Sequence, residues 1–179
     1  MESPQAIPAP MPSAAQPREL SRLAALLRYE ILDTPEESAF DDFTALAAQM
    51  CDTPIALISL VDDRRQWFKS RVGLDVSETP RDISFCTYTI TGEQIFEVPD
   101  ALQDPRFRDN PLVQGDPHIR FYAGTPLTSP DGHNLGTLCV IDRKPRRLSS
   151  EQRETLERLG RQVIRLFEQH LLAHRHAEQ

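Results

Sequence analysis

The stretch Ile55-Ala56-Leu57-Ile58-Ser59-Leu60-Val61 is short, rich in branched residues and apolar at both alternating sets of positions. This pattern predicts a strand that is buried on both faces of a sheet. The residues Asp62-Asp63-Arg64 predict a turn, and Gln66-Trp67-Phe68-Lys69-Ser70 predicts a second strand. Two strands joined by a short polar turn are typical of a hairpin, so the sheet is expected to be antiparallel here.

A second hairpin is predicted towards the end of the chain. Residues 119–127 and 135–141 form two apolar runs, and Ser129-Pro130-Asp131-Gly132-His133 between them has the composition of a turn. A short strand is also expected at 95–98. Because the strands come in adjacent pairs with helices before and after them, we predict an α+β fold whose central, mainly antiparallel sheet has about five to six strands.

Three helices are predicted outside the sheet. The first begins near Arg18, and its apolar face is expected to consist of Leu20, Leu23, Ala24, Leu27 and Ile31. A second helix is expected to begin at a capping box in which Thr34 is the cap and Glu37 is the third helical residue. The same pattern at Ser149-Ser150-Glu151-Gln152 predicts the start of a long helix that ends at about His174.

Composition limits the classes of partner. The formal net charge of −7 argues against a nucleic-acid partner and against docking on anionic lipid, both of which need clustered Lys and Arg. The three scattered cysteines do not form a disulfide framework, so a cytoplasmic location is expected. Residues 1–17 are rich in Pro and Ala and are predicted to be a disordered leader before a single domain at 18–179. No metal site is predicted.

Several segments, in order along the chain, resemble a known family. They are Ile31-Leu32-Asp33-Thr34, Pro54 to Asp62, Gln66 to Ser70, Glu78-Thr79-Pro80-Arg81-Asp82, Ser84-Phe85-Cys86, Asn110-Pro111-Leu112-Val113, Ile119 to Gly124 and Leu135 to Asp142. From about residue 20 to 170 the chain is similar to a subgroup of GAF domains that precede histidine kinases and diguanylate cyclases in bacterial signalling proteins. The resemblance implies a sheet with the terminal helices on one face and an irregular segment on the other, and a ligand cavity beneath that segment.

The resemblance also suggests which residues border the cavity. The candidates lie in a short helix at 84–90, in the irregular middle and on the two strands of the second hairpin; they are Phe85, Cys86, Tyr88, Phe107, Phe121, Tyr122, Gly124, Thr137 and Cys139. Ordinary core packing is the alternative for this set. If Ser84 caps the short helix, the helix dipole would lower the pKa of the Cys86 thiol and make it reactive, although a packing role for Cys86 is favoured.

Two further groups have a functional and a structural interpretation. Glu78, Arg81 and Asp82 are expected to form a charged cluster beside the cavity that either binds a polar ligand group or, the favoured alternative, holds the loop by ion pairs. The last helix has a partial heptad, which predicts either a homodimer or simple packing on its own sheet. The stripe consists of Leu156, Leu159, Val163 and Leu166.

We therefore predict a sensory domain of bacterial signal transduction that is not an enzyme. It would bind an unidentified small molecule or sense redox state, and it would signal to an effector protein through its terminal helices. No cofactor can be named. Two alternatives stay open: an enzyme similar to free methionine-(R)-sulfoxide reductase that uses Cys86, and a dimerisation module without a ligand.

Overall fold

A computed structural model describes residues 17–177, so the leader predicted at 1–17 lies almost wholly outside the described residues. The centre of the fold is a six-stranded sheet in the order β3-β2-β1-β6-β5-β4, and every neighbouring pair is antiparallel. The strands are β1 (Ile55–Val61), β2 (Arg65–Val72), β3 (Glu78–Pro80), β4 (Phe96–Val98), β5 (Phe121–Thr128) and β6 (Asn134–Asp142). The predicted α+β class and antiparallel sheet are confirmed, and β3 is an edge strand where a polar loop was expected.

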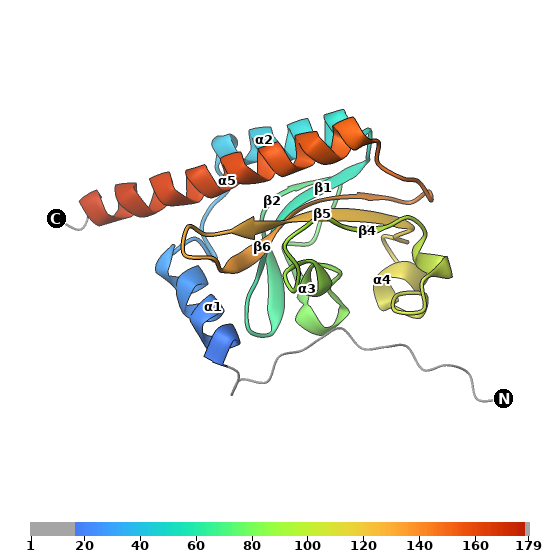
Figure 1. Cartoon of the computed structure of the whole chain (residues 1–179), viewed down its shortest axis with the longest axis horizontal. Helices are drawn as coiled ribbons and strands as arrows, with labels where there is room; N and C mark the ends of the chain where they lie inside the picture. The colour runs from blue at the N-terminus through green and yellow to red at the C-terminus, as the bar shows by residue number, and fades with distance from the viewer. Residues whose placement is uncertain (1–16, 178–179) are drawn as a thin grey trace.

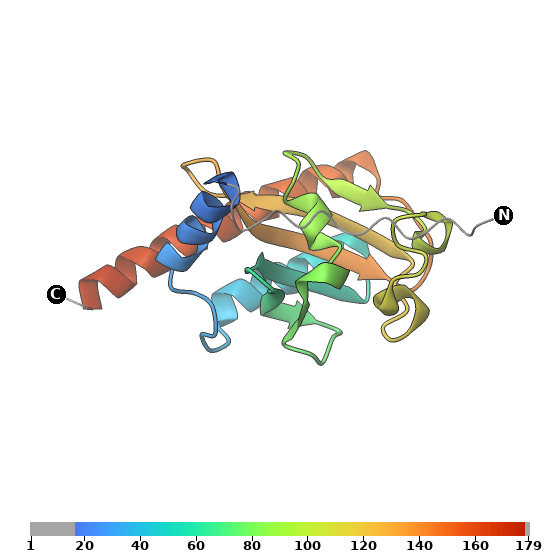
Figure 2. The ribbon, with the colours of Figure 1, turned by 90° about the horizontal axis from the view of Figure 1, so that it is seen from below.

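Long helices and short helices cover different faces of the sheet (Figure 1). The helices α2 (Ser38–Cys51) and α5 (Ser150–Ala177) lie side by side on one face, and α1 (Pro17–Arg28) lies at the end of the sheet near the β5–β6 turn. The other face carries α3 (Cys86–Thr89), α4 (Pro111–Gln114) and the single-turn helices η1 (Arg81–Ile83) and η2 (Ala101–Gln103), as the view from below shows (Figure 2). None of the helices within residues 17–177 has the length and apolar character needed to cross a membrane.

The sheet separates two apolar clusters, and β1 contributes to both. Ala56, Ile58 and Leu60 pack in the cluster that contains α2 and α5. Ile55 and Leu57 point to the opposite face and pack in the cluster beneath α3. Alternate residues of a strand point to opposite faces, so the continuously apolar run has a partner layer on each side, as predicted.

The helix α1 forms where it was predicted, but most of the predicted buried face is wrong: Ile31 is completely buried and Leu23 half-buried, whereas the other three residues are exposed. Leu20 and Leu27 are 51% and 60% exposed, while Glu19, Arg22 and Leu26 are buried. Glu19 and Arg22 form an ion pair at 2.9 Å inside the protein. The helix is therefore oriented by a buried charged contact that hydrophobic spacing alone does not register.

One of the two predicted capping boxes forms. The Ser149 hydroxyl accepts a hydrogen bond from the Gln152 amide at 3.1 Å, and the Gln152 side chain accepts one from the Ser149 amide at 2.9 Å. The box at Thr34 is wrong, because α2 begins at Ser38 and has no side-chain cap. Thr34 instead accepts a hydrogen bond from the Lys69 ammonium at 2.8 Å, so a contact distant in sequence replaces the local one.

The heptad stripe of α5, which was predicted to form a dimer interface, packs largely in the core of its own domain. Leu156 and Val163 are completely buried with the sheet residues of the same chain, so they cannot form an exposed interface. Leu159 and Leu166 are partly buried and lie at the margin of that cluster. The assignment of Leu156 and Val163 to a dimer interface is therefore wrong, and dimerisation itself stays a prediction.

Candidate functional site

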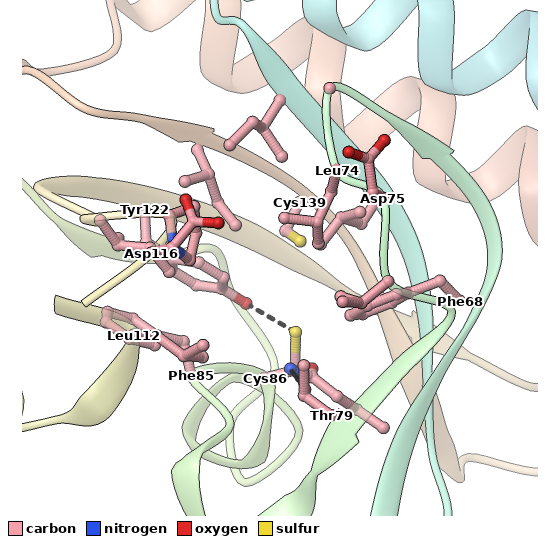
Figure 3. A pocket seen from close by; sticks show the side chains of 18 of the residues that line it. Phe68, Leu74, Asp75, Thr79, Phe85, Cys86, Leu112, Asp116, Tyr122 and Cys139 are labelled. Carbon is pink, nitrogen blue, oxygen red and sulfur yellow. Dashed lines mark hydrogen bonds between the residues drawn. The ribbon is translucent and has the colours of Figure 1, made fainter.

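A cavity of about 220 Å³ lies between the sheet and the segments that connect its outer strands (Figure 3). Leu74 and Asp75 lie on one side of it and Leu112 and Asp116 on the other, with Cys86 and Tyr122 between them. The side chains that line it are mainly apolar, so the cavity combines an apolar wall with a few polar groups. This composition is typical of small-molecule sites.

The hairpin of β5 and β6 forms one wall of the cavity. Tyr122 and Gly124 point to this face of β5, and Thr137 and Cys139 to the same face of β6, because residues two apart share a face. Gly124 lies opposite Cys139 in the strand register. The Tyr122 side chain crosses over Gly124, where any added Cβ would overlap the tyrosine hydroxyl. Glycine at this position therefore allows Tyr122 to reach Cys86.

Cys86 is the first residue of α3 and is only 2% exposed. Its Sγ lies 3.0 Å from Thr137 Oγ1 and accepts a hydrogen bond from the Tyr122 hydroxyl at 3.3 Å. The same tyrosine oxygen lies 2.7 Å from Thr89 Oγ1. The thiol is thus held by uncharged hydroxyl groups of the sheet, and Thr89 of its own short helix contacts one of them, the Tyr122 hydroxyl.

The predicted cap on this short helix does not form. Ser84 donates its hydroxyl proton to Gln66 Oε1 at 2.9 Å instead of capping α3, which has no side-chain cap. A single-turn helix with four residues also has too short a dipole to dominate the thiol. The proposed reason for a low pKa at Cys86 is therefore wrong.

Hydrogen bonds give the thiol a low pKa by another route. Burial raises the pKa of Cys86, but hydrogen bonds from Cys139, Thr137 and Tyr122 outweigh it and lower the pKa to about 7. The pKa of Cys139 is raised, first because its thiol donates to Cys86 and then because it is buried. Of the two cysteines, Cys86 is therefore the one whose thiolate is favoured, because its pKa is lowered while the pKa of Cys139 is raised.

Gln66 is a site residue that the sequence analysis did not find. It is 5% exposed and lines the cavity. Its side-chain oxygen accepts hydrogen bonds from Ser59 at 3.0 Å and from Ser84 at 2.9 Å, and its nitrogen donates to Thr79 at 2.6 Å. The sequence did contain a signal for this residue. Gln66 lies two positions before Phe68 on a predicted strand, and residues two apart on a strand point to the same face.

The structure brings four of the nine predicted cavity residues to the cavity itself. Phe85, Cys86, Tyr122 and Cys139 line it. Thr137 is completely buried behind Cys86, and Gly124 lies beneath Tyr122.

The remaining predicted aromatic residues lie elsewhere. Phe107 stacks on Phe85 with ring centroids 4.0 Å apart, so it supports the wall from behind. Tyr88 packs edge-on against Phe107 at 4.9 Å and borders a different surface depression. Phe121 points to the opposite face of the sheet and packs in the cluster of α2 and α5, because it neighbours Tyr122 on a strand. The assignment of Phe121 to the cavity is therefore wrong.

The predicted charged cluster does not assemble. Arg81 is buried and forms an ion pair with Glu19 of α1 at 2.7 Å, whereas Glu78 is exposed and contacts Arg65 at 3.1 Å. Asp82 is exposed, and none of the three predicted residues lines the cavity. The charged residues that do border it are Asp75, Asp116 and Arg143, which are exposed. Within residues 17–177 no group of three His, Cys, Asp or Glu side chains is arranged to hold a metal ion.

Comparison with known proteins identifies relatives of this architecture. A family model described as GAF domain matches residues 35–165. A protein of Pseudomonas aeruginosa named cyclic di-GMP phosphodiesterase is 50% identical over 147 residues, which are 82% of this chain and 25% of that protein. The chain therefore spans about a quarter of the length of this relative.

Two solved structures share the fold. The GAF domain of an Acinetobacter phosphoenolpyruvate-protein phosphotransferase has a TM-score of 0.62 and 20% identity, over 90% of this chain and 96% of that one. Free methionine-R-sulfoxide reductase from Neisseria meningitidis, in complex with its substrate, has a TM-score of 0.62 and 18% identity over the same shares, 90% and 96%. At these identities the likeness shows the fold alone.

The Pseudomonas relative also corrects one prediction. The sequence predicts a chain that is not an enzyme, whereas the relative with 50% identity carries the name of an enzyme, a phosphodiesterase. That prediction is contradicted. The predicted association with signalling agrees with the same name.

Proposed function

Because this chain belongs to the GAF domain family, we propose that it is the sensory region of a cyclic di-GMP phosphodiesterase and that a small molecule bound beside Cys86 regulates that activity. The observation that carries the proposal is the cavity of about 220 Å³ with the Cys86 thiol and Tyr122 hydroxyl on its wall. The phosphodiesterase activity is inferred from the Pseudomonas relative.

The size and chemistry of the cavity define the ligand. A volume of about 220 Å³ corresponds to roughly seven water molecules at about 30 Å³ each. This is below the range of about 300–1,000 Å³ that holds drug-sized molecules, so we expect an occupant smaller than a nucleotide. The walls are largely apolar. Among the residues that line the cavity, two are acidic, Asp75 and Asp116, and one is basic, Arg143. We expect a compact ligand without net negative charge that has one or two hydrogen-bonding groups.

The sheet provides a physical route from the cavity to the long helix. Cys139 of β6 lines the cavity, while its neighbours Leu138 and Val140 pack in the cluster that contains α5. A ligand that shifts β6 would therefore change the packing beneath α5, provided it binds two arrangements of the domain with different affinity. Transmission through α5 to a partner copy or an effector belongs to the same proposal.

The ligand is tested by native mass spectrometry of freshly purified protein. We expect an added mass on the wild type that is lost in Ile141→Trp, which fills the cavity, and kept in Leu172→Trp on the exposed side of α5. A hybrid in which this chain replaces the matching region of the Pseudomonas protein then reports regulation. The ligand should change its rate of cyclic di-GMP hydrolysis, and a rate that never responds would refute the regulatory role.

A second candidate, redox sensing, is favoured by the two cysteines, Cys86 and Cys139, that line the same cavity. The Cys86 thiolate would attack one peroxide oxygen and break the O–O bond, forming a sulfenic acid and expelling an alkoxide or hydroxide that takes a proton from solvent. The Cys139 thiol would then displace water from that sulfenic acid to form a disulfide. Intact mass after peroxide treatment should fall by two hydrogen atoms in the wild type. Addition of oxygen alone in both the wild type and Cys139→Ser would exclude the disulfide.

A further inference from the structure

Arg81 is a buried cation whose hydrogen bonds are only partly satisfied. Its side chain is 2% exposed. One terminal nitrogen, Nη1, donates to Glu19 at 2.7 Å and to the Asp62 carbonyl at 3.1 Å. The other two nitrogens, Nε and Nη2, are buried and have no hydrogen-bond partner among residues 17–177. Buried donors without a partner are rare in folded proteins, so these two indicate a missing acceptor.

The two free donors share one edge of the guanidinium plane. Nε–H and the adjacent Nη2–H point in parallel and form a fork that fits two oxygens of a carboxylate or phosphate. Arg22, next to Arg81, shows this geometry within the same structure. Its Nε and Nη2 donate to the two oxygens of Glu19 at 2.9 and 3.0 Å. Arg81 presents the same edge without an acceptor.

A second cavity, of about 210 Å³, has Arg81 in its wall. It lies between α1, α3 and the β5–β6 turn, and it shares no lining residue with the cavity beside Cys86. Arg18, Arg22 and Arg81 line it together with a single acidic residue, Glu19. Glu19 is already shared by Arg22 and Arg81, which leaves a positive charge in excess. The charge balance of the cavity favours an anion.

We propose that this second cavity binds a small oxyanion, through a carboxylate or phosphate group held by Nε and Nη2 of Arg81. The site would also connect distant parts of the fold. Arg22 donates to the Asn134 carbonyl at 3.2 Å, and the Asn134 amide donates to the Ile90 carbonyl at the end of α3 at 2.9 Å. The Arg81 carbonyl accepts a hydrogen bond from Thr87 of α3 at 3.1 Å. An oxyanion would therefore hold α1 against the helix that carries Cys86.

Thermal unfolding of the 179-residue chain in sodium phosphate, sodium acetate and sodium chloride at matched ionic strength tests the site. An oxyanion at ten times its dissociation constant should raise Tm by about 3–6 °C, while chloride should not. The rise should disappear in Arg81→Gln and persist in Arg64→Gln, a control whose side chain is 93% exposed. Whether phosphate or acetate gives the larger rise identifies the oxyanion.

A second measurement keeps the proposal testable if Arg81→Gln does not fold. The Nε–H signal of Arg81 in the wild-type NMR spectrum, assigned through its own backbone, should shift saturably with the same oxyanion. Equal Tm in all three salts together with an unmoved Nε–H signal would show that water satisfies the two donors, and would overturn the proposal. Equal rises in the wild type and in a folded Arg81→Gln variant would overturn it as well.

Discussion

Gly124→Ala should disrupt the contact between Tyr122 and Cys86. The Tyr122 side chain crosses over Gly124, and a Cβ there would overlap the hydroxyl and approach Cζ to 2.9 Å. Because the strand backbone is fixed by β4 and β6, the tyrosine ring must move. The movement breaks the hydrogen bonds to Cys86 and Thr89, at about 1 kcal/mol each.

The expected loss of stability follows from three contributions. Overpacking adds about 1–3 kcal/mol to the two lost hydrogen bonds. Replacing glycine by alanine stabilises the folded state by about 0.4–1 kcal/mol, because the unfolded chain then has less conformational entropy to lose on folding. We therefore expect Gly124→Ala to lower the free energy of unfolding by about 2–5 kcal/mol.

Urea unfolding followed by fluorescence of the single tryptophan, Trp67, measures this change. Gly92→Ala is the matched control, because nothing lies within 4 Å of its added Cβ, and it should change stability by less than about 1 kcal/mol.

A double-mutant cycle separates the clash from other effects. Tyr122→Phe removes the hydroxyl, which overlaps most and makes both hydrogen bonds, so Gly124→Ala should cost at least about 2 kcal/mol less in that background. The reasoning is refuted if Gly124→Ala lies within about 0.5 kcal/mol of the wild type, or if the two changes are fully additive.

Three further predictions concern the thiol, a helix cap and the core. The rate of Cys86 alkylation should reach half its maximum near pH 7. Tyr122→Phe should raise the pH of this midpoint, because the thiolate loses a hydrogen-bond donor. A wild-type midpoint at the ordinary cysteine pKa of about 8.5 would contradict the hydrogen-bond mechanism. Ser149→Ala should lower the free energy of unfolding by about 1 kcal/mol in urea, since it removes the cap of α5, and an unchanged value would show that the cap is not needed. Leu156→Ala should lower the free energy of unfolding by about 2–5 kcal/mol, because Leu156 is completely buried. Leu172 is 55% exposed, so Leu172→Ala should lower it by less than about 0.5 kcal/mol. Equal losses in the two variants would contradict the assigned core face of α5.

The sequence by itself determined the sheet and several local features. The run Ile55 to Val61 is apolar on both faces apart from Ser59, so it had to lie between two layers. The capping box at Ser149 and Gln152 depends only on residues three apart, and it formed as predicted. A pattern of this range needs no distant partner to form, although at Thr34 the distant contact with Lys69 replaced the same kind of box.

Only the tertiary structure decided which side chains meet. Phe121 and Tyr122 are adjacent aromatic residues, but strand alternation sends one to α5 and the other to Cys86. Arg81 precedes Cys86 by five residues, yet it faces Glu19 across 62 positions of sequence and belongs to a different cavity. A composition or a spacing cannot specify such contacts, because the orientation of each side chain depends on the packing of elements that are far apart in the chain.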